Sequence, residues 1–337
     1  MPSVRTPLLA TCALLAAGVL TSCGSGSTAT TGAGSGGDVG APVTVTNCGT
    51  EVTVDSPPER IVTIKSTPTE LVLALGLGER IVGTAFLDGP VPEELAPEDA
   101  LTEISDQAPG QEAVLELEPD LVFAGWESNL AADTAGERDV LADLGVATYV
   151  SPSACQSEGA PEQMTYDLLF DHFTEAGDLL GAQEAAAELV AEQRAELDDL
   201  GRLAEEPTAL WWSSGTDTPF VGGGTGAPQM VMERVGLANI AADVDQTWTS
   251  LGWEAVVDAD PDVLVLVDAD WNSAAQKIEH LESHPATREL SAVKAGRYLT
   301  VPFPAGEAGV RSVSAAAGLL AQAEELGLDV TAVGGGD

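Results

Sequence analysis

The chain has 337 residues, of which 44% are hydrophobic and only 4% aromatic, so it is long enough for two domains of ordinary size. This composition fits an Ala/Val/Leu-rich α/β protein and excludes an intrinsically disordered one. The net charge of −41 excludes nucleic-acid binding, which needs a basic face, and electrostatic docking onto anionic lipid.

The first residues have the pattern of a targeting segment. Arg5 precedes the apolar stretch 8–20, whose thirteen residues are too few to span a bilayer comfortably. The sequence Leu-Thr-Ser-Cys that ends at Cys23 resembles the bacterial lipobox, in which the cysteine is acylated after cleavage. We therefore expect a lipoprotein signal peptide at 1–22 and a Gly/Ser/Thr-rich flexible tether at 23–41. The mature protein would lie outside the cytoplasm, anchored by its lipid to the outer face of the cell membrane.

Cysteine usage agrees with an oxidising compartment. Of four cysteines, Cys12 leaves with the signal peptide and Cys23 is the lipid site, so Cys48 and Cys155 remain. Two cysteines in such a compartment favour one disulfide; the alternative is two free thiols. Because no Cys-x-x-Cys motif or Cys/His cluster occurs, we expect no structural zinc site.

Strand and helix patterns alternate in the first part of the chain. Residues 43–54 alternate as a hairpin with Asn47-Cys48-Gly49 at its turn. Further strands are predicted at 60–65, 80–86, 121–124 and 147–150, with helices between them that begin near Pro68 and Val140. Alternation of this kind predicts a parallel α/β lobe, to which we assign residues 42–182.

One stretch of this lobe occurs again later in the chain. Residues 111–125 and 253–267 both run Glu-Ala-Val, a short acidic helix, Pro-Asp and an apolar strand. Proline cannot continue the helix, and an unbroken apolar run suits a parallel strand that is covered on both faces. The copies lie 142 residues apart, which predicts two related lobes rather than a solenoid.

The connection between the lobes is helical. Residues 161–203 carry no strand signal and predict two helices that break near Gly177–Gly181. The second helix, at about Gln183–Leu203, would be about 30 Å long, the width of a small domain. We expect a rigid linker helix at 183–205 and a second α/β lobe, also with a parallel sheet, at 206–330.

Motifs for catalysis are missing from the sequence. There is no Gly-x-Ser-x-Gly elbow and no His-Glu-x-x-His, and the glycine run 222–226 lacks the ending of a phosphate loop. His280 and His284 have a spacing that could hold a metal ion, but Pro285 ends their helix and no third ligand is near. We therefore expect no enzyme, no cofactor and no bound metal.

The predicted topology itself indicates a binding site, because parallel α/β sheets bind ligands beyond the carboxyl ends of their strands. The candidate residues at those ends are Lys65, Ser66, Trp126, Trp212, Trp271, Phe303 and, at the start of the last helix, Arg311. Each tryptophan alone could equally fill the core. Together they predict an apolar stacking pocket in a cleft between the lobes, with Lys65 and Arg311 as its cations.

These features resemble a known family. Pro57–Val62, Thr69–Gly76, the two repeated stretches and Ala292–Arg297 occur in an order that is similar to ABC-transporter substrate-binding proteins for iron–siderophore, haem and cobalamin. The resemblance covers about residues 43–326. It implies two α/β lobes bridged by a long helix and a bulky metal chelate held between them.

The resemblance also assigns two glutamates. One glutamate in each lobe of such proteins docks on arginines of the membrane permease, and Glu112 and Glu254 stand at the matching positions. The simpler alternative is that each complements the positive end of its helix dipole and needs no partner.

We thus expect a monomeric lipid-anchored receptor that works with an ABC permease and its ATPase and binds a ferric siderophore. Haem and cobalamin remain alternatives. Haem would need an axial Tyr, His or Met, for which Tyr149 is a weak candidate. From other classes, an extracellular α/β enzyme and a sensory or adhesive lipoprotein also remain.

Overall fold

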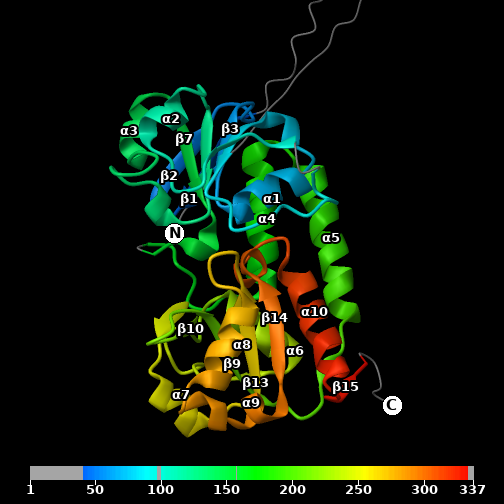
Figure 1. Cartoon of the computed structure of the whole chain (residues 1–337). Helices are drawn as coiled ribbons and strands as arrows, with labels where there is room; N and C mark the ends of the chain where they lie inside the picture. Colours follow the sequence, from blue (N-terminus) through cyan, green and yellow to red (C-terminus); the bar gives the residue numbers. More distant parts are fainter. Residues whose placement is uncertain (1–40, 97–99, 157, 333–337) are drawn as a thin grey trace, which may run out of the picture. The chain divides into compact units, whose positions relative to one another are not determined.

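The computed structural model describes residues 41–96, 100–156 and 158–332, which belong to one compact unit (Figure 1). The predicted signal peptide, the tether and Cys23 lie outside the described residues. None of the described helices combines the length and apolarity that crossing a membrane would require.

The first lobe is built on a five-stranded sheet with the order β5-β4-β3-β6-β7, in which every pair is parallel, as predicted. All residues of β3 and β6 are buried, which explains their unbroken apolar runs. The strands are β3 (Ile61–Ile64), β4 (Ile81–Ala85), β5 (Glu103–Ser105), β6 (Leu121–Ala124) and β7 (Ala147–Val150). The helices are α1 (Ser66–Ala74), α2 (Gln111–Leu115) and α3 (Arg138–Asp143), with short 3-10 turns η1 (Gly78–Arg80), η3 (Glu127–Asn129) and η4 (Pro152–Ala154).

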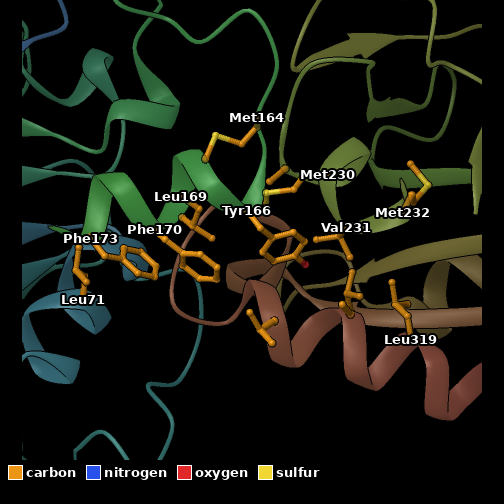
Figure 2. Packing of buried hydrophobic residues seen from close by; sticks show 14 of the residues in the cluster. Leu71, Met164, Tyr166, Leu169, Phe170, Phe173, Met230, Val231, Met232 and Leu319 are labelled. Carbon is orange, nitrogen blue, oxygen red and sulfur yellow. The ribbon is translucent and has the colours of Figure 1, made fainter. Parts of the chain in front are cut away.

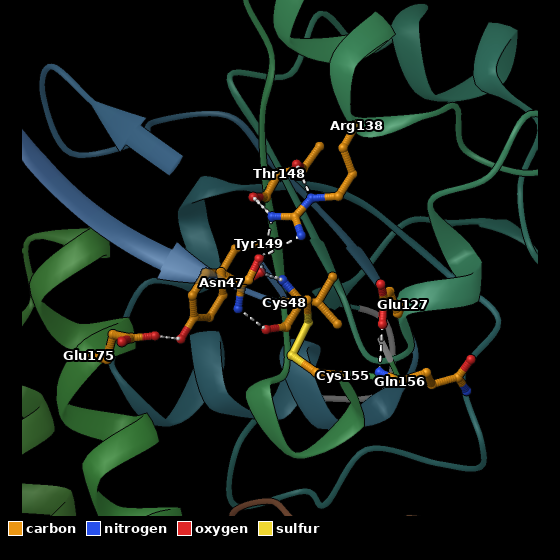
Figure 3. The surroundings of a disulfide bond; sticks show 10 residues. Asn47, Cys48, Glu127, Arg138, Thr148, Tyr149, Cys155, Gln156 and Glu175 are labelled. Atoms are coloured by element: carbon orange, nitrogen blue, oxygen red, sulfur yellow. Dashed lines mark hydrogen bonds between the residues drawn. A yellow bond between two sulfur atoms is a disulfide. The ribbon is translucent and has the colours of Figure 1, made fainter. Parts of the chain in front are cut away.

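A hairpin precedes this sheet and is tied by a disulfide to the loop that follows the sheet's last strand. It consists of β1 (Val43–Asn47) and β2 (Thr50–Val54), paired antiparallel as predicted. The structure joins Cys48 to Cys155, 107 residues later, which confirms the predicted pairing (Figure 3). Beside it, Asn47 Nδ2 donates to the Val150 carbonyl at 2.8 Å and Arg138 Nη1 donates to the Asn47 carbonyl at 2.8 Å. The hairpin turn is therefore fixed to the loop that follows β7.

Two long helices, α4 (Tyr166–Leu180) and α5 (Gln183–Asp199), connect the lobes. Before α4, the Met164 amide donates to the Thr225 carbonyl of the second lobe, and at its end the Leu180 carbonyl accepts from Arg80 Nη1 of the first. Gly181 then reverses the chain with a φ of 68°, a conformation that glycine adopts without strain. The chain thus passes between the lobes three times. Helix α5, with α4 packed beside it, begins at Gln183 as the predicted linker helix does, but it ends at Asp199, and Arg202–Leu203 of the predicted linker form the short strand β8.

The second lobe is built on the sheet β12-β10-β9-β13-β14, and β11 also pairs with β9. Strands β9, β11, β13 and β14 are parallel, whereas β10 is antiparallel to both β9 and β12. The predicted parallel sheet is present in these four strands, and β10 adds an antiparallel strand because the short loop 215–219 between β9 and β10 can join only antiparallel neighbours. The strands are β9 (Thr208–Ser214), β10 (Phe220–Gly222), β11 (Ala238–Asn239), β12 (Trp248–Ser250), β13 (Val263–Asp268) and β14 (Tyr298–Pro302); β8 (Arg202–Leu203) and β15 (Val330–Thr331) form a separate antiparallel pair.

Helices cover this second sheet. They are α6 (Ala227–Val235), α7 (Trp253–Ala259), α8 (Ala274–Ser283), α9 (Ser291–Ala295) and α10 (Ser312–Glu325), with the 3-10 turns η5 (Thr287–Glu289) and η6 (Phe303–Gly306). Helices α2 and α7 each lead into a buried strand, β6 and β13, so the repeated stretches of sequence fold alike in the two lobes.

The largest hydrophobic cluster runs from one lobe to the other through α4 (Figure 2). It includes Leu71 of α1, Phe170 of α4 and Leu319 of α10, all buried. The Tyr166 hydroxyl, also on α4, donates to the Ser312 carbonyl at 2.9 Å. The connecting helices therefore share a core with both lobes.

Candidate ligand-binding cleft

Two cavities lie at the carboxyl ends of the strands and share three aromatic residues. A cavity of about 480 Å³ is lined from both lobes, and one of about 840 Å³ is lined mainly from the first lobe. Trp126, Trp271 and Phe303 line both. Trp271 is 60% exposed and meets Phe303 edge to face, with ring centroids 5.8 Å apart. Three of the predicted candidate residues are thus brought together in one cleft.

Lys65 lines the larger cavity, but its positive charge is already compensated by a neighbouring carboxylate. Its side chain forms an ion pair with Asp88, and the two side chains are 3% and 6% exposed. The ammonium also lies 4.1 Å from the ring centroid of Phe86, 3.8 Å from that of Trp126 and 5.5 Å from that of Phe303. Cation–π attraction of this kind is strongest where the cation is desolvated. Lys65 is therefore a fixed part of the wall rather than a free cation.

The backbone at these strand ends is strained. Lys65 after β3 has a φ of 82° and Phe86 after β4 has a φ of 54°, values that residues with a side chain rarely adopt. Such conformations cost about 1–3 kcal/mol each and cluster at functional sites. At the end of β6, a Cβ on Gly125 would lie 2.6 Å from the Lys65 Cβ, so only glycine leaves room for this lysine.

Arg311 does not line either cavity, contrary to the prediction. Its Nε donates to Glu70 Oε2 at 2.8 Å and its Nη2 donates to the Pro90 carbonyl at 2.8 Å. Burial raises the pKa of Glu70, and the bond and charge of Arg311 lower it, with a net increase. Because Glu70 lies on α1 and Arg311 precedes α10, this pair links the two lobes.

Trp212 is the clearest disagreement with the sequence prediction. It is completely buried, its ring lies 5.0 Å edge to face from that of Trp253, and its Nε1 donates to the Ser214 carbonyl at 2.7 Å. Side chains alternate between the faces of a strand, so Ser213 reaches the smaller cavity while Trp212 packs under the sheet. Ser66 is also fully buried, and its Oγ accepts from the Asp88 amide at 2.9 Å.

Sequence reasoning missed several cleft residues. Phe220 and Trp248 stack with ring centroids 5.8 Å apart and line the smaller cavity. Trp248 lies on β12, a three-residue strand that is too short to show an alternating pattern, so no local signal indicates it. Glu307 lines the same cavity, and burial first, then the charge of Asp88, raises its pKa to about 7, although Lys65 and a hydrogen bond from Trp126 lower it.

The lining of the two cavities is acidic as well as aromatic. Among the described residues that line them, Lys65 is the only lysine or arginine. The exposed carboxylates Glu103, Asp106 and Asp270 line the larger cavity and form no ion pair within the described part of the chain. The same part of the chain contains no group of three or more His, Cys, Asp and Glu that could hold a metal ion. The cleft is therefore suited to a ligand that is neutral or positively charged.

The two glutamates expected to dock on a permease lie outside this cleft. Glu112 and Glu254 occupy the first turns of α2 and α7, and both are exposed. Neither lines one of the two cavities. Their positions in the two related lobes are equivalent.

Two α/β lobes, joined by helices and enclosing an aromatic cleft, form the architecture of a bilobal substrate-binding protein. Residues 61–305 match the family described as periplasmic binding protein, and the chain belongs to it. It is a substrate-binding component of an ABC transporter, as the resemblance in its sequence implied.

Individual relatives support this assignment. The chain is 28% identical over 269 residues to the uncharacterized ABC transporter substrate-binding lipoprotein YvrC of Bacillus subtilis, covering 77% of this chain and 78% of that protein. It is 30% identical over 240 residues to a cobalamin-binding protein of Halobacterium salinarum, covering 66% of this chain and 57% of that protein. A solved structure of an ABC-type Fe3+-hydroxamate transport system from Saccharomonospora viridis superposes with a TM-score of 0.69 at 27% identity, covering 85% of this chain and 99% of that one.

Proposed function

We propose that this protein captures a ferric siderophore of the hydroxamate type and delivers it to a membrane permease. The observation that carries the proposal is the cleft lining, which is aromatic and acidic and has its one lysine neutralised by Asp88. Three hydroxamate anions around Fe³⁺ give a neutral core, which an acidic cleft does not repel. The solved relative from Saccharomonospora viridis, which belongs to an Fe3+-hydroxamate transport system, supports this ligand class.

The size of the cleft also supports a bulky chelate. Cavities of about 480 and 840 Å³ share one aromatic wall, and ligand pockets commonly measure about 300–1,000 Å³. Trp271 and Phe303 line both cavities and meet edge to face, so their apolar rings can pack on the apolar linkers of a hydroxamate chelate.

Haem fits this lining less well. It carries two carboxylates that would face acidic residues, and its iron needs an axial ligand. No described His or Tyr lines either cavity, and Met164, which lines the smaller one, is only 2% exposed. Tyr149 is 1% exposed and its hydroxyl donates to Glu175 at 2.6 Å, while burial raises its pKa well above 10.

Cobalamin is the second candidate, because the relative from Halobacterium salinarum is a cobalamin-binding protein. A protein can bind cobalamin without supplying an axial ligand to the cobalt. The absence of His and Tyr from the lining of the described cavities therefore does not count against cobalamin as the ligand.

Tryptophan fluorescence separates these candidates. A neutral ferric trihydroxamate should quench this fluorescence saturably. The affinity obtained from the titration should be higher than that for cyanocobalamin or haem. Trp271→Ala should weaken binding by about 1–2 kcal/mol, or five- to thirtyfold, without a change in melting temperature because Trp271 is 60% exposed. Leu144→Ala, at a residue 57% exposed outside the cleft, is the matched control. Tighter binding of cyanocobalamin would reassign the ligand, and no saturable binding of any chelate would refute the proposal.

We further propose that the protein is extracytoplasmic and anchored to the membrane by a lipid on Cys23. The supporting observations are the sequence that ends at Cys23 and the relative YvrC, which is described as a lipoprotein. Cys23→Ala should release the protein into the medium or leave an unprocessed precursor. Unchanged partitioning of the variant into detergent would contradict lipid anchoring.

A further inference from the structure

We propose that the larger cavity contains a sub-site for a positively charged substituent of the ligand, such as a protonated primary amine. The inference rests on the proposed function, because it concerns a second recognition element on the same chelate. Three exposed carboxylates carry it: Glu103 on β5, Asp106 just after β5, and Asp270 beyond the end of β13. They come from both lobes and line one cavity of about 840 Å³.

A second observation is independent of these carboxylates. Thr84 on β4 lines the same cavity and is completely buried, and its hydroxyl oxygen has no hydrogen-bond partner. A buried polar atom that is left unpaired costs about 1–3 kcal/mol, so native structures seldom keep one without a reason. An ammonium group of a ligand can donate a hydrogen bond to this oxygen and so supply the missing partner.

The wall of the cavity already holds one ammonium group. Lys65 Nζ lies 3.8 Å from the ring centroid of Trp126 and 4.1 Å from that of Phe86, and it is paired with Asp88. Aromatic faces combined with carboxylates are the surroundings that protein sites use to bind organic cations. The same combination occurs again in the lining of this cavity, where Trp271 directly follows Asp270 in sequence.

The arrangement indicates a ligand of two parts. A neutral ferric trihydroxamate core would pack on the shared wall of Trp126, Trp271 and Phe303. A charged arm would extend from it toward Glu103, Asp106 and Asp270. A linear trihydroxamate with one free terminal amine has this form, and its binding is reversible ion pairing without a covalent step.

The test compares two chelates that differ only in this arm. A linear ferric trihydroxamate with a free terminal amine and its N-acetylated counterpart share the same core and iron coordination. Isothermal titration at low salt should show about tenfold tighter binding of the amine form, with the preference falling as salt rises. Glu103→Gln/Asp106→Asn/Asp270→Asn should remove the preference, and its melting temperature reports whether the fold is kept.

The control must separate local recognition from the overall acidity of a chain with a net charge of −41. Glu184→Gln/Glu188→Gln/Glu192→Gln changes the net charge equally at exposed positions of α5, which line neither cavity. This variant should keep the full preference. An equal loss of preference in both variants, or equal affinities of the wild-type protein for the two chelates, would overturn the sub-site while leaving the proposed function in place. No binding of either chelate would overturn both.

Discussion

The buried ion pair of Lys65 and Asp88 allows a sharp test of how the cleft wall is stabilised. The two side chains are 3% and 6% exposed, and Asp88 also accepts from the Ser66 amide at 3.3 Å. Asp88→Asn keeps the size of the side chain and one acceptor oxygen but removes the negative charge that is paired with the buried ammonium. Removing one partner of a buried pair costs about 3–5 kcal/mol. The attraction of Lys65 to the rings of Phe86 and Trp126 remains, so we expect a loss of about 3 kcal/mol.

Urea denaturation at pH 7 measures this loss as a lower midpoint with an unchanged slope. Lys65→Met/Asp88→Asn is the control, because it removes both charges and leaves an apolar side chain of similar length. The double variant should recover most of the stability, and the double-mutant cycle then isolates the coupling between the two residues. A loss below about 1 kcal/mol in Asp88→Asn would refute this account, since it would mean that Lys65 loses its proton or reaches water at little cost.

Three further predictions follow from other parts of the molecule. Cys48→Ser/Cys155→Ser opens a loop with a sequence separation of 107 and should cost up to about 4–5 kcal/mol, seen as a lower melting temperature that reducing agent no longer changes; an unaltered melting temperature would contradict this. Glu307 has a pKa of about 7 in the folded protein against an ordinary 4.5, so its contribution to stability is complete below about pH 4.5 and is lost as pH rises through 7. Glu307→Gln should reduce this loss of stability by about 1–3 kcal/mol. Identical pH profiles of stability for the variant and the wild type would show that Glu307 is not the cause. Glu112→Ala/Glu254→Ala changes two exposed side chains and should leave ligand affinity and melting temperature near the wild type while uptake through the permease collapses; lost ligand binding would instead place these residues at the cleft.

The parallel core of both lobes could be predicted from the sequence because its signals are local. Strands β6 and β13 each follow a Pro-Asp pair, and their residues are apolar without a break except for the final Asp268 of β13. Strands β5 and β12 have three residues each and lie among loops, where no periodicity can develop. Glu103 and Trp248, which lie on these strands, were therefore missed as cleft residues.

The cleft could be predicted only in part, because side-chain direction and long-range partners are not local properties. Trp126, Trp271 and Phe303 follow strand ends and line the cavities as expected. Trp212 and Ser213 are neighbours in one strand, so their side chains point to opposite faces of the sheet, and an error of one position exchanges the two faces. Arg311 pairs with Glu70 at a sequence separation of 241, and no sequence motif predicts this pairing.

The hydrophobic cluster that passes through α4 has a consequence for how the protein unfolds. Leu71, Phe170 and Leu319 belong to two lobes and a connecting helix, yet they are buried in one apolar body. If one lobe melted alone, the face of α4 that it covers would meet water at a cost of about 25 cal/mol per Å². We therefore expect the lobes to unfold together, in one cooperative calorimetric transition, and a destabilising substitution in either lobe to lower the stability of both.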